Sequence, residues 1–390
     1  MPVPNRLADL QPEMAEWRQD IHAHPELGYE EQRTSDLVAA KLAEWGIEVH
    51  RGLGVTGLVG VLRNGDSGRS VGLRADMDCL PMNDESGAPY ASTVPGKAHA
   101  CGHDGHTTML LGAAKYLAET RNFDGTVHFI FQPAEEGGAG ARAMIQDGLF
   151  GRFPCDKVFG VHNDPNLKLG EAAVVSGPVL AASDRVNIFI KGIGGHAARP
   201  HQAVDPIVVG AQIVVAMQAI VARRVDPLDS AVISLCQFHA GSASNVIPET
   251  AEIRGTVRTL RPGTQDEMER LITQTAKAIG ALNDAEVTVE YVRGYPPTVN
   301  DEAETERAAL AAAKVVGQER VIRKRPPNMG GEDFSFMLLE RPGCFVKLGQ
   351  DDGARGGVAL HNPKYDFNDA LLPIGAGFFA ALVEQELPRG

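Results

Sequence analysis

The sequence predicts an α/β protein interrupted by a smaller α+β unit. In residues 1–183 and 294–390, short apolar strands alternate with amphipathic helices, an order typical of a largely parallel sheet covered by helices. Residues 184–293 follow the order strand, helix, strand, strand, helix, strand, which predicts a ferredoxin-like antiparallel sheet with both helices on one face. The chain has 390 residues, of which 43% are hydrophobic, so it can bury a core in each part.

The first part of the chain is expected to begin with two helices. Apolar residues recur at helical spacing over 7–23 and 30–45, and Pro25 and Gly28 separate the two runs. The elements expected next are strands at 58–62 and 71–75, a helix at 106–119, and strands at 126–131 and 158–161. The turn-rich segment 64–68 joins the first two of these strands, which we therefore expect to form a hairpin or to lie side by side.

The inserted segment has a complete set of elements of its own. Its expected strands are 185–190, 231–238, 251–259 and 286–292, and its expected helices are 206–223 and 265–282. After it, the first pattern resumes with a helix at 302–316, a strand at 344–348 and a helix at 371–387. The sequence therefore predicts a discontinuous first domain, 1–183 with 294–390, and a second domain at 184–293.

Composition excludes several classes of partner. The net charge is −13, from 50 acidic and 37 basic residues, and no block of Lys and Arg stands out, so we expect no nucleic acid partner. The five cysteines are scattered and odd in number, which favours reduced thiols over a disulfide framework. The N-terminus has no apolar signal region, and no run of 18 apolar residues occurs, so we expect no membrane partner and a cytoplasmic location.

Residues 97–106 concentrate potential metal ligands. They contain one thiol, three imidazoles and one carboxylate just before an apolar run, a density that core packing does not require. Taken alone, Cys101 could be a small buried apolar residue and the histidines a surface cluster, because a single Cys-x-His is a weak motif. The metal interpretation therefore depends on partners from distant segments.

Those partners occur at strand ends and loops expected on one rim of the sheet, where α/β proteins gather functional groups. The candidate ligands from four separate segments are Cys101, His103, Glu136, His162 and His361. This many ligands suits two divalent ions about 3.5–4 Å apart with one bridging side chain. Zn, Mn, Ni and Co all accept imidazole and carboxylate, whereas Mg²⁺ and Ca²⁺ prefer sites built from oxygen alone.

Glu135 and Glu136 are adjacent carboxylates in a glycine-bounded loop. Such a pair can diverge, so that one binds metal and its neighbour faces the substrate as a general base, which needs proximity without coordination. The alternative is a solvated acidic turn. Beside the other ligands, the sequence favours Glu135 as the base.

Six short motifs together resemble a known enzyme family. They are RADMD at 74–78, CGHDGH at 101–106, QPAEE at 132–136, GHAA at 195–198, NVIP at 245–248 and LHNP at 360–363. The chain resembles, nearly end to end, the dinuclear amidohydrolases of the hippurate hydrolase, N-acyl-amino-acid amidohydrolase and auxin-conjugate (IAA-amino acid) hydrolase type. The resemblance implies an aminopeptidase-like α/β catalytic domain with an inserted ferredoxin-like dimerisation (lid) domain.

The resemblance also implies a role for each candidate ligand. Cys101 would bridge the two ions, standing where more distant relatives use an aspartate. His103 and His162 would complete one metal site, and Glu136 and His361 the other. It gives the general-base role to Glu135, in agreement with the residue-level interpretation.

Further residues acquire roles from the resemblance alone. Asp76 would hold the His103 imidazole by a hydrogen bond. His196 would stabilise the oxyanion from the lid of the same or a partner subunit. Asn245 and Arg258 would bind the free carboxylate of the substrate. His106 we interpret as supporting or packing the site.

The implied activity is hydrolysis of the linear amide bond of N-acyl amino acids, hippurate-like or N-acetylated, releasing a carboxylic acid and an amino acid. A dipeptidase or carboxypeptidase on the same dimetal site is an alternative, and a metal-binding homologue without catalysis is another. Retention of an unliganded base argues against the last, since binding alone needs none. We expect a homodimer, because the inserted sheet has an edge strand available for pairing, or a homotetramer.

Overall fold

The structure is a computed structural model and describes residues 4–389. It divides into two compact units, which we describe separately. The first comprises the described chain up to Gly177, Val299–Pro326 and the chain from Asp333 onward; the second comprises Pro178–Thr298 and Pro327–Glu332. The sequence-based boundaries lie a few residues inside the second unit, and the return of 327–332 to it was not predicted. Residues 184–293 remain the proposed lid domain.

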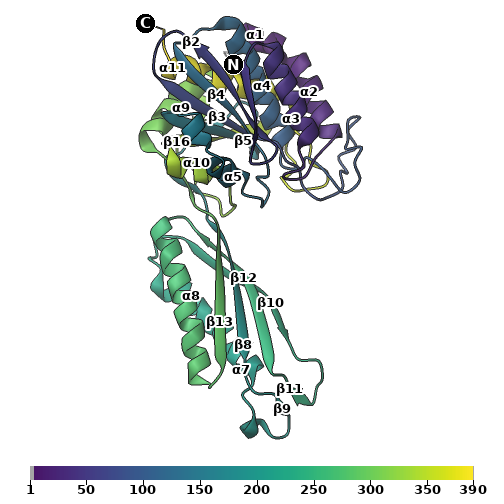
Figure 1. The fold of residues 1–390 in the computed structure, drawn as a ribbon, viewed down its shortest axis with the longest axis vertical. Coiled ribbons are helices and arrows are strands. Elements are labelled where there is room, and N and C mark those ends of the chain that lie inside the picture. Colours follow the sequence, from purple (N-terminus) through teal and green to yellow (C-terminus); the bar gives the residue numbers. More distant parts are fainter. Residues whose placement is uncertain (1–3, 390) are drawn as a thin grey trace. The chain divides into compact units, whose positions relative to one another are not determined.

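An eight-stranded sheet forms the centre of the first unit (Figure 1). Its strands, in spatial order, are β1 Glu48–Leu53, β2 Gly57–Asn64, β4 Gly125–Gln132, β3 Ser70–Asp76, β5 Lys157–Lys168, β16 Gly343–Asp351, β6 Ala172–Ala173 and β15 Val321–Ile322. Strands β4, β3, β5 and β16 are mutually parallel, and β1 and β2 add an antiparallel edge. The α/β prediction is confirmed, with a mixed sheet whose central strands are parallel.

The predicted pairing of the strands at 58–62 and 71–75 is wrong. β4 lies between β2 and β3, and β2 forms its hairpin with β1. The sequence analysis missed β1 because its side chains are mostly exposed or half-buried, so it lacks the apolar alternation of a strand that packs on a core.

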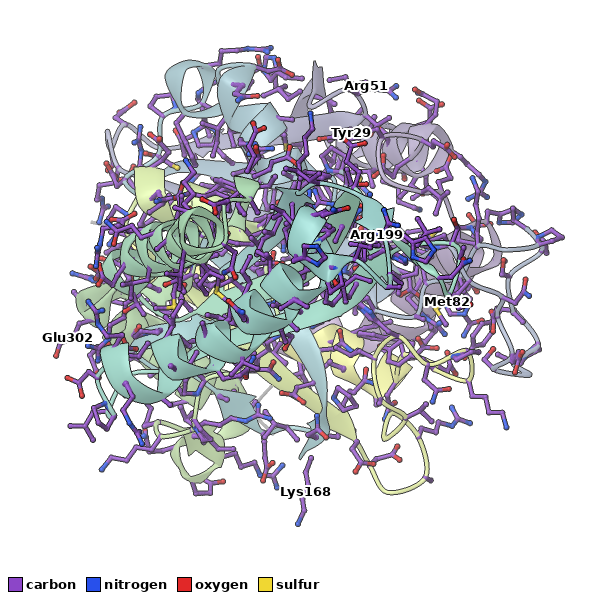
Figure 2. The ribbon with its side chains drawn as sticks, turned by 90° about the horizontal axis from the view of Figure 1, so that it is seen from below. Tyr29, Arg51, Met82, Lys168, Arg199 and Glu302 are labelled. Atoms are coloured by element: carbon purple, nitrogen blue, oxygen red, sulfur yellow. The ribbon has the colours of Figure 1, made fainter. Side chains whose placement is uncertain are left out.

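The first unit contains the helices predicted at 30–45, 106–119, 302–316 and 371–387, whereas the one predicted at 7–23 is divided into two and three short helices are added. In chain order, the helices of this unit are α1 Asn5–Asp9, α2 Gln11–Ala23, α3 Gln32–Glu44, α4 His103–Thr120, α5 Gly140–Gln146, α6 Leu149–Arg152, α9 Glu302–Val316, α10 Phe334–Glu340 and α11 Leu372–Glu386. α4 packs against α2, α3 and α11, and nearly every residue of α11 is buried, as its uniform apolarity requires. Charged residues at element ends, such as Lys168 and Glu302, point outward (Figure 2).

The second unit is the predicted ferredoxin-like fold. Its antiparallel sheet has the order β10 Ala231–Ala240, β12 Thr250–Thr259, β8 Ser183–Lys191 and β13 Glu286–Tyr295. Helices α7 Pro206–Arg224 and α8 Pro262–Leu282 share one apolar core with these strands. β10 is an edge strand whose residues are exposed or half-buried throughout.

Helix α7 has an unusual distribution of apolar residues. By length and composition it is the one helix, among residues 4–389, that could cross a membrane. Val209 and Met217 instead pack in the core of the second unit, whereas Ile207, Val208 and Val215 are exposed. The helix therefore has apolar residues on two of its faces. One face packs in the core of the second unit, and the other has no partner within the described part of this unit.

Glycine at 105 is required by close packing. A Cβ at Gly105, in the first turn of α4, would overlap the ring of Phe367. We predict that Gly105→Ala lowers the free energy of unfolding by about 1–3 kcal/mol, as over-packed cores do, measured as a lower urea midpoint of the first unit. Gly151→Ala is the matched control, because Gly151 lies in α6 and faces open space. Equal midpoints for the two variants would contradict the prediction.

Candidate metal centre

The structure brings the five predicted ligands together in the first unit. They come from the start of α4, from the loop after β4, from β5 and from the loop before α11: Cys101 and His103, Glu136, His162 and His361. The donor atoms of Cys101, His103 and His162 lie within 4.8 Å of one another. Those of Cys101, Glu136 and His361 do so as well. The two triads share one member, the thiol.

Backbone geometry at the start of α4 places the first two ligands. Gly102 separates them and has a left-handed φ of 93°, and a Cβ there would overlap the side chains of Asn163 and Tyr365. Only glycine therefore allows Cys101 and His103 to approach β5 this closely. The backbone N–H of His361 donates to Ala100 O at 2.8 Å, which fastens the last ligand loop beside Cys101.

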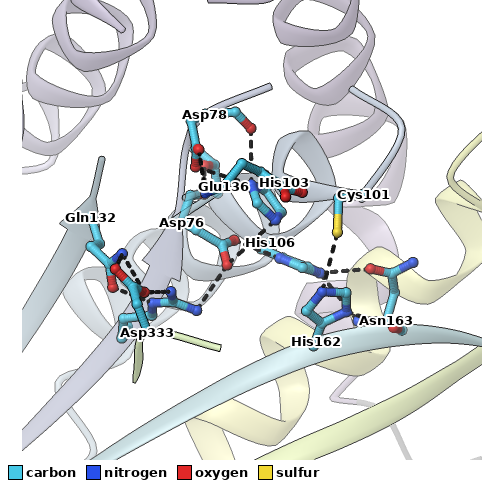
Figure 3. A network of polar contacts seen from close by, with 12 residues as sticks. Asp76, Asp78, Cys101, His103, His106, Gln132, Glu136, His162, Asn163 and Asp333 are labelled. Atoms are coloured by element: carbon cyan, nitrogen blue, oxygen red, sulfur yellow. Dashed lines mark hydrogen bonds and ion pairs between the residues drawn. The ribbon is translucent and has the colours of Figure 1, made fainter. Parts of the chain in front are cut away.

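His162 lies inside a strand rather than just past its end. The sequence analysis ended this strand at 161, but β5 continues to Lys168 because β16 pairs with it, with Lys347 opposite His162. Cys101 Sγ and His162 Nε2 are 3.5 Å apart (Figure 3). Long-range pairing therefore extended a segment whose polar residues predicted a loop.

Two histidines each use Nδ1 in a hydrogen bond to a backbone carbonyl, so that Nε2 faces the other candidate ligands. His162 Nδ1 donates to Asn163 O at 2.7 Å, which leaves Nε2 facing the Cys101 thiol. His103 Nδ1 donates to Asp78 O at 2.9 Å, and its buried Nε2 has no hydrogen-bond partner within residues 4–389. A buried ring nitrogen without a hydrogen-bond partner is costly, so the donor set fits a metal ion that would take the place of the Nε2 proton.

One predicted contact is wrong. We expected Asp76 to hold His103 by a hydrogen bond, but His103 Nδ1 lies beside Asp78, 3.2 Å from Oδ1, whereas Asp76 Oδ1 accepts from His106 Nδ1 at 2.6 Å (Figure 3). Asp76 contacts His103 only at the other ring nitrogen, where Asp76 Oδ2 and His103 Nε2 form an ion pair at 3.7 Å. Two carboxylates two residues apart face two histidines three residues apart, and the sequence does not say which pairs form. Asp78 Oδ2 also accepts the Glu136 N–H at 2.8 Å, so Asp78 holds one member of each triad.

Behind the triads lies a buried charge network that the sequence analysis did not predict. Arg74 donates to Gln132 Oε1 and Asp76 Oδ2, both at 2.8 Å, and to Asp333 Oδ1 at 3.0 Å. All four side chains are inaccessible to solvent. An arginine within an otherwise apolar strand was the feature that could have revealed it, because a buried guanidinium requires paired carboxylates.

His106 supports this network. Its Nε2 accepts the backbone N–H of Asn163 at 3.1 Å and lies 2.8 Å from Asn163 Oδ1, and Asn163 Nδ2 donates to Tyr365 OH at 2.7 Å. With Nδ1 bonded to Asp76, both ring nitrogens are engaged. His106 is therefore bound within the support of the site, as its predicted role requires.

Glu135 lies beside the triads without belonging to either. It is buried, and its carboxylate oxygen lies within 4.8 Å of ligand atoms of His103 and Glu136. His361, in contrast, has 55% of its side chain exposed, and its Nε2 is 3.2 Å from Glu136 Oε1. The Glu136–His361 side is therefore the solvent-accessible side of an otherwise buried donor set.

The ionisation of the metal-free donors is set by burial and by neighbouring charge. Burial raises the pKa of Cys101 to about 12. Burial opposes protonation of His103, but Asp76 and the Cys101 thiol outweigh it and raise the pKa of His103 well above its usual value. Burial, with Lys347 nearby, lowers the pKa of His162. His162 is thus ready to coordinate, whereas His103 and Cys101 must first lose a proton.

The predicted residues of the second unit lie at opposite ends of its sheet. The strands β9 Gly195–His196 and β11 Val246–Ile247 pair with each other, and Ala197 N donates to Asn245 O at 3.1 Å, so His196 and Asn245 are neighbours beyond the Lys191 end of β8. Arg258 lies near the other end of β12, roughly 25 Å away at ~3.3 Å per residue. One small carboxylate cannot touch both Asn245 and Arg258 of the same chain.

Comparison with known proteins gives a consistent result. A model of Peptidase family M20/M25/M40 matches residues 72–385. Hippurate hydrolase of Campylobacter jejuni is 43% identical over 376 residues, 96% of this chain and 97% of that protein. IAA-amino acid hydrolase ILR1-like 4 of Arabidopsis thaliana is 40% identical over 95% of this chain and 84% of its own length.

A solved structure also matches throughout. The Bacillus subtilis YxeP protein, described as a dinuclear metal-binding peptidase from the M20 family, superposes with a TM-score of 0.84 at 32% identity. The match covers 96% of this chain and 98% of that one.

The protonated donors predict a pH-dependent metal affinity. Because bound metal needs the Cys101 thiolate and neutral His103, whose pKa values are raised in the metal-free protein, binding should release protons. We expect the affinity of the metal-free protein for Zn²⁺ to rise between pH 6 and 8, by roughly tenfold per pH unit for each proton displaced. Titration against a chelator at several pH values measures this.

Two serine variants accompany this titration, Cys155→Ser as the control and Cys101→Ser as the test of the shared thiol. Cys155→Ser alters another buried thiol of the first unit, whose pKa burial also raises to about 12, and should leave the affinity and its pH dependence unchanged. Cys101→Ser should weaken both ions together, because its hydroxyl stays protonated and cannot bridge them as a thiolate would. An affinity independent of pH in the unaltered protein would contradict the ionisation states described.

Proposed function

The chain belongs to Peptidase family M20/M25/M40 and is a dinuclear metallohydrolase, and on this premise we propose that it hydrolyses the amide bond of N-acyl amino acids, releasing a carboxylic acid and an amino acid. The observation that supports the proposal most is the pair of triads sharing Cys101, with the buried Glu135 carboxylate beside them. The names of the two curated relatives denote amino acids joined to an acyl group, and both align over nearly the whole chain. Hippurate-like and N-acetyl amino acids are therefore the proposed substrates.

The ligands divide into two subsites around the thiolate. Cys101 would bridge two divalent ions, with His103 and His162 completing one subsite and Glu136 and His361 the other. A set of thiolate, imidazole and carboxylate donors suits Zn, Mn, Ni or Co. Two such ions supply Lewis acidity toward the amide carbonyl and lower the pKa of water.

Glu135 is the proposed proton carrier. Its carboxylate has an oxygen within 4.8 Å of ligand atoms of Glu136 and His103, and the two triads that share Cys101 are complete without it. It takes a proton from the attacking water and passes it to the leaving amine, the transfer that a general base within hydrogen-bond reach performs. Asp78 and the Arg74 network keep the surrounding donors fixed while this proton moves.

The second unit supplies the proposed substrate contacts. His196 is exposed and lies with Asn245 at the end of its sheet away from the connections at Pro178 and Thr298. We assign His196 to oxyanion stabilisation and Asn245 to the substrate carboxylate. Because Arg258 is too far from Asn245 in one chain, joint use of the two requires residues from two subunits.

A homodimer is the proposed assembly. The exposed edge strand β10 and the exposed apolar residues of α7 both belong to the second unit, and each offers a surface that a second copy could cover. A homotetramer would need a further interface. The cytoplasm remains the proposed location.

Replacing the base tests the activity. We predict that Glu135→Gln lowers kcat for N-benzoyl and N-acetyl amino acids by ~10²–10⁴-fold while both metal ions stay bound, because the amide is isosteric but cannot accept the proton. Glu136→Gln is the matched variant and should lose metal as well as activity. Glycyl dipeptides in the same substrate panel test the peptidase alternative. Full turnover by metal-loaded Glu135→Gln protein would refute the assignment of the base.

Subunit mixing tests the role of His196. His196→Ala should reduce kcat by roughly 10²–10³-fold with a smaller change in KM, since an oxyanion donor acts mainly in the transition state. If the donor comes from the partner, mixed dimers of His196→Ala and Glu135→Gln chains regain one working site. Verified mixed dimers without activity would show that His196 does not act across subunits.

A further inference from the structure

The loop that carries Glu135 and Glu136 has a strained backbone. We call residues 133–140, which link β4 to α5, the base loop. Ala134 has a φ of 52° and Ala139 a φ of 56°, both in the left-handed region that residues other than glycine rarely adopt. Such a conformation persists only where surrounding contacts hold it, and it recurs at functional sites. Some contact must therefore hold the positive φ of Ala134, the residue that precedes Glu135 and Glu136 in the chain.

That contact comes from Glu31, which is distant in sequence. The Glu31 side chain is inaccessible to solvent; its Oε1 accepts the Ala134 N–H at 2.8 Å, and its Oε2 accepts the Thr56 hydroxyl at 2.6 Å. Burial raises the pKa of Glu31 to about 7, so keeping a carboxylate here is costly. An apolar residue would fill the space, but it would leave the buried Ala134 N–H without an acceptor.

The neighbours of Glu31 touch the base loop at further points. A Cβ on Gly28 would lie 2.9 Å from the Ala134 Cβ, so only glycine lets the two segments approach this closely. The Tyr29 hydroxyl donates to Gly138 O at 2.7 Å, near the other end of the base loop. Residues 28–31 thus form a support under the base loop.

We propose that Glu31 is a positioning residue for Glu135 and Glu136, acting through its hydrogen bond to the Ala134 backbone. The proposal rests on the proposed function, in which these two glutamates act as base and metal ligand. Glu31 itself touches neither water nor metal in this role.

The geometry shows how the effect would be transmitted. With its N–H held by Glu31, Ala134 keeps a positive φ, and its carbonyl accepts from Gly140 N at 3.1 Å, closing the base loop. Two residues further on, the Glu136 N–H donates to Asp78 Oδ2 at 2.8 Å. Without the Glu31 acceptor, Ala134 would relax toward an ordinary negative φ and turn both carboxylates together. Misplacement of about 1 Å can lower an enzyme's rate by 10²-fold.

The first experiment compares the two hydrogen bonds of the Glu31 carboxylate. Glu31→Ala should lower kcat by ~10²-fold with little change in KM. Thr56→Val, the matched control, removes the other bond and leaves the Ala134 contact, so it should lower kcat only a few-fold. Glu31→Gln keeps an oxygen that can accept the Ala134 N–H and should therefore retain most of the kcat of the unaltered protein.

Metal binding gives a readout independent of turnover. Titration of metal-free protein with Co²⁺, followed by its visible absorption, should show one of two ions bound ~10–100-fold more weakly in Glu31→Ala, because Glu136 is displaced. Thr56→Val should bind as the unaltered protein does. This shift would appear even if the proposed substrates were wrong, which separates failure of the proposed function from failure of the positioning role.

The decisive variant is a second substitution in the strained residue itself. Glycine adopts a positive φ without support. The double variant Glu31→Ala/Ala134→Gly should therefore have a kcat at least tenfold higher than Glu31→Ala, and should regain most of the Co²⁺ affinity. If Glu31→Ala fails to fold, the same comparison uses Glu31→Leu. Three outcomes would each overturn the proposal. The first is a folded Glu31→Ala or Glu31→Leu protein with unchanged Co²⁺ binding and kcat. The others are equal effects of Thr56→Val and Glu31→Ala, and no rescue by Ala134→Gly.

Discussion

The carboxylate of Asp78 joins the two halves of the candidate metal centre. One oxygen lies beside His103 Nδ1 and the other accepts the Glu136 N–H, so a single buried side chain orients donors from the start of α4 and from the loop after β4. Both contacts direct N–H groups toward the carboxylate, in a buried place where water cannot supply the hydrogen bonds. The remaining ligands are arranged around this link.

Close backbone approach is the second condition on which the site depends. Gly102 separates two ligands where any side chain would overlap Asn163 and Tyr365, and Gly28 lets the segment before α3 reach Ala134. In each case the missing Cβ makes room for a polar contact that fixes a functional side chain. The glycines carry no reactive group, but the close approach that they allow fixes the positions of side chains that do.

The sequence predicted the parts that depend on local periodicity or on residue type. The ferredoxin-like order, the closing helix and the five candidate ligands all follow from short patterns, and the structure brings those ligands together. It did not predict that β4 lies between β2 and β3, because strand order is decided by tertiary contacts. It also assigned Asp76 to His103, a choice between near-equivalent carboxylates that side-chain direction alone decides.

The placement of β16 has a consequence for how the protein is made. β16 lies between β5 and β6 in the sheet, yet it is synthesised after the whole second unit, and His361 follows it. On the ribosome, β5 must therefore wait with an unpaired edge while the second unit, whose four strands are contiguous in the chain, can already fold. The nascent first unit is open to chaperones and to misassociation during this interval. Its candidate ligand set is complete only once His361 has been synthesised, near the end of the chain.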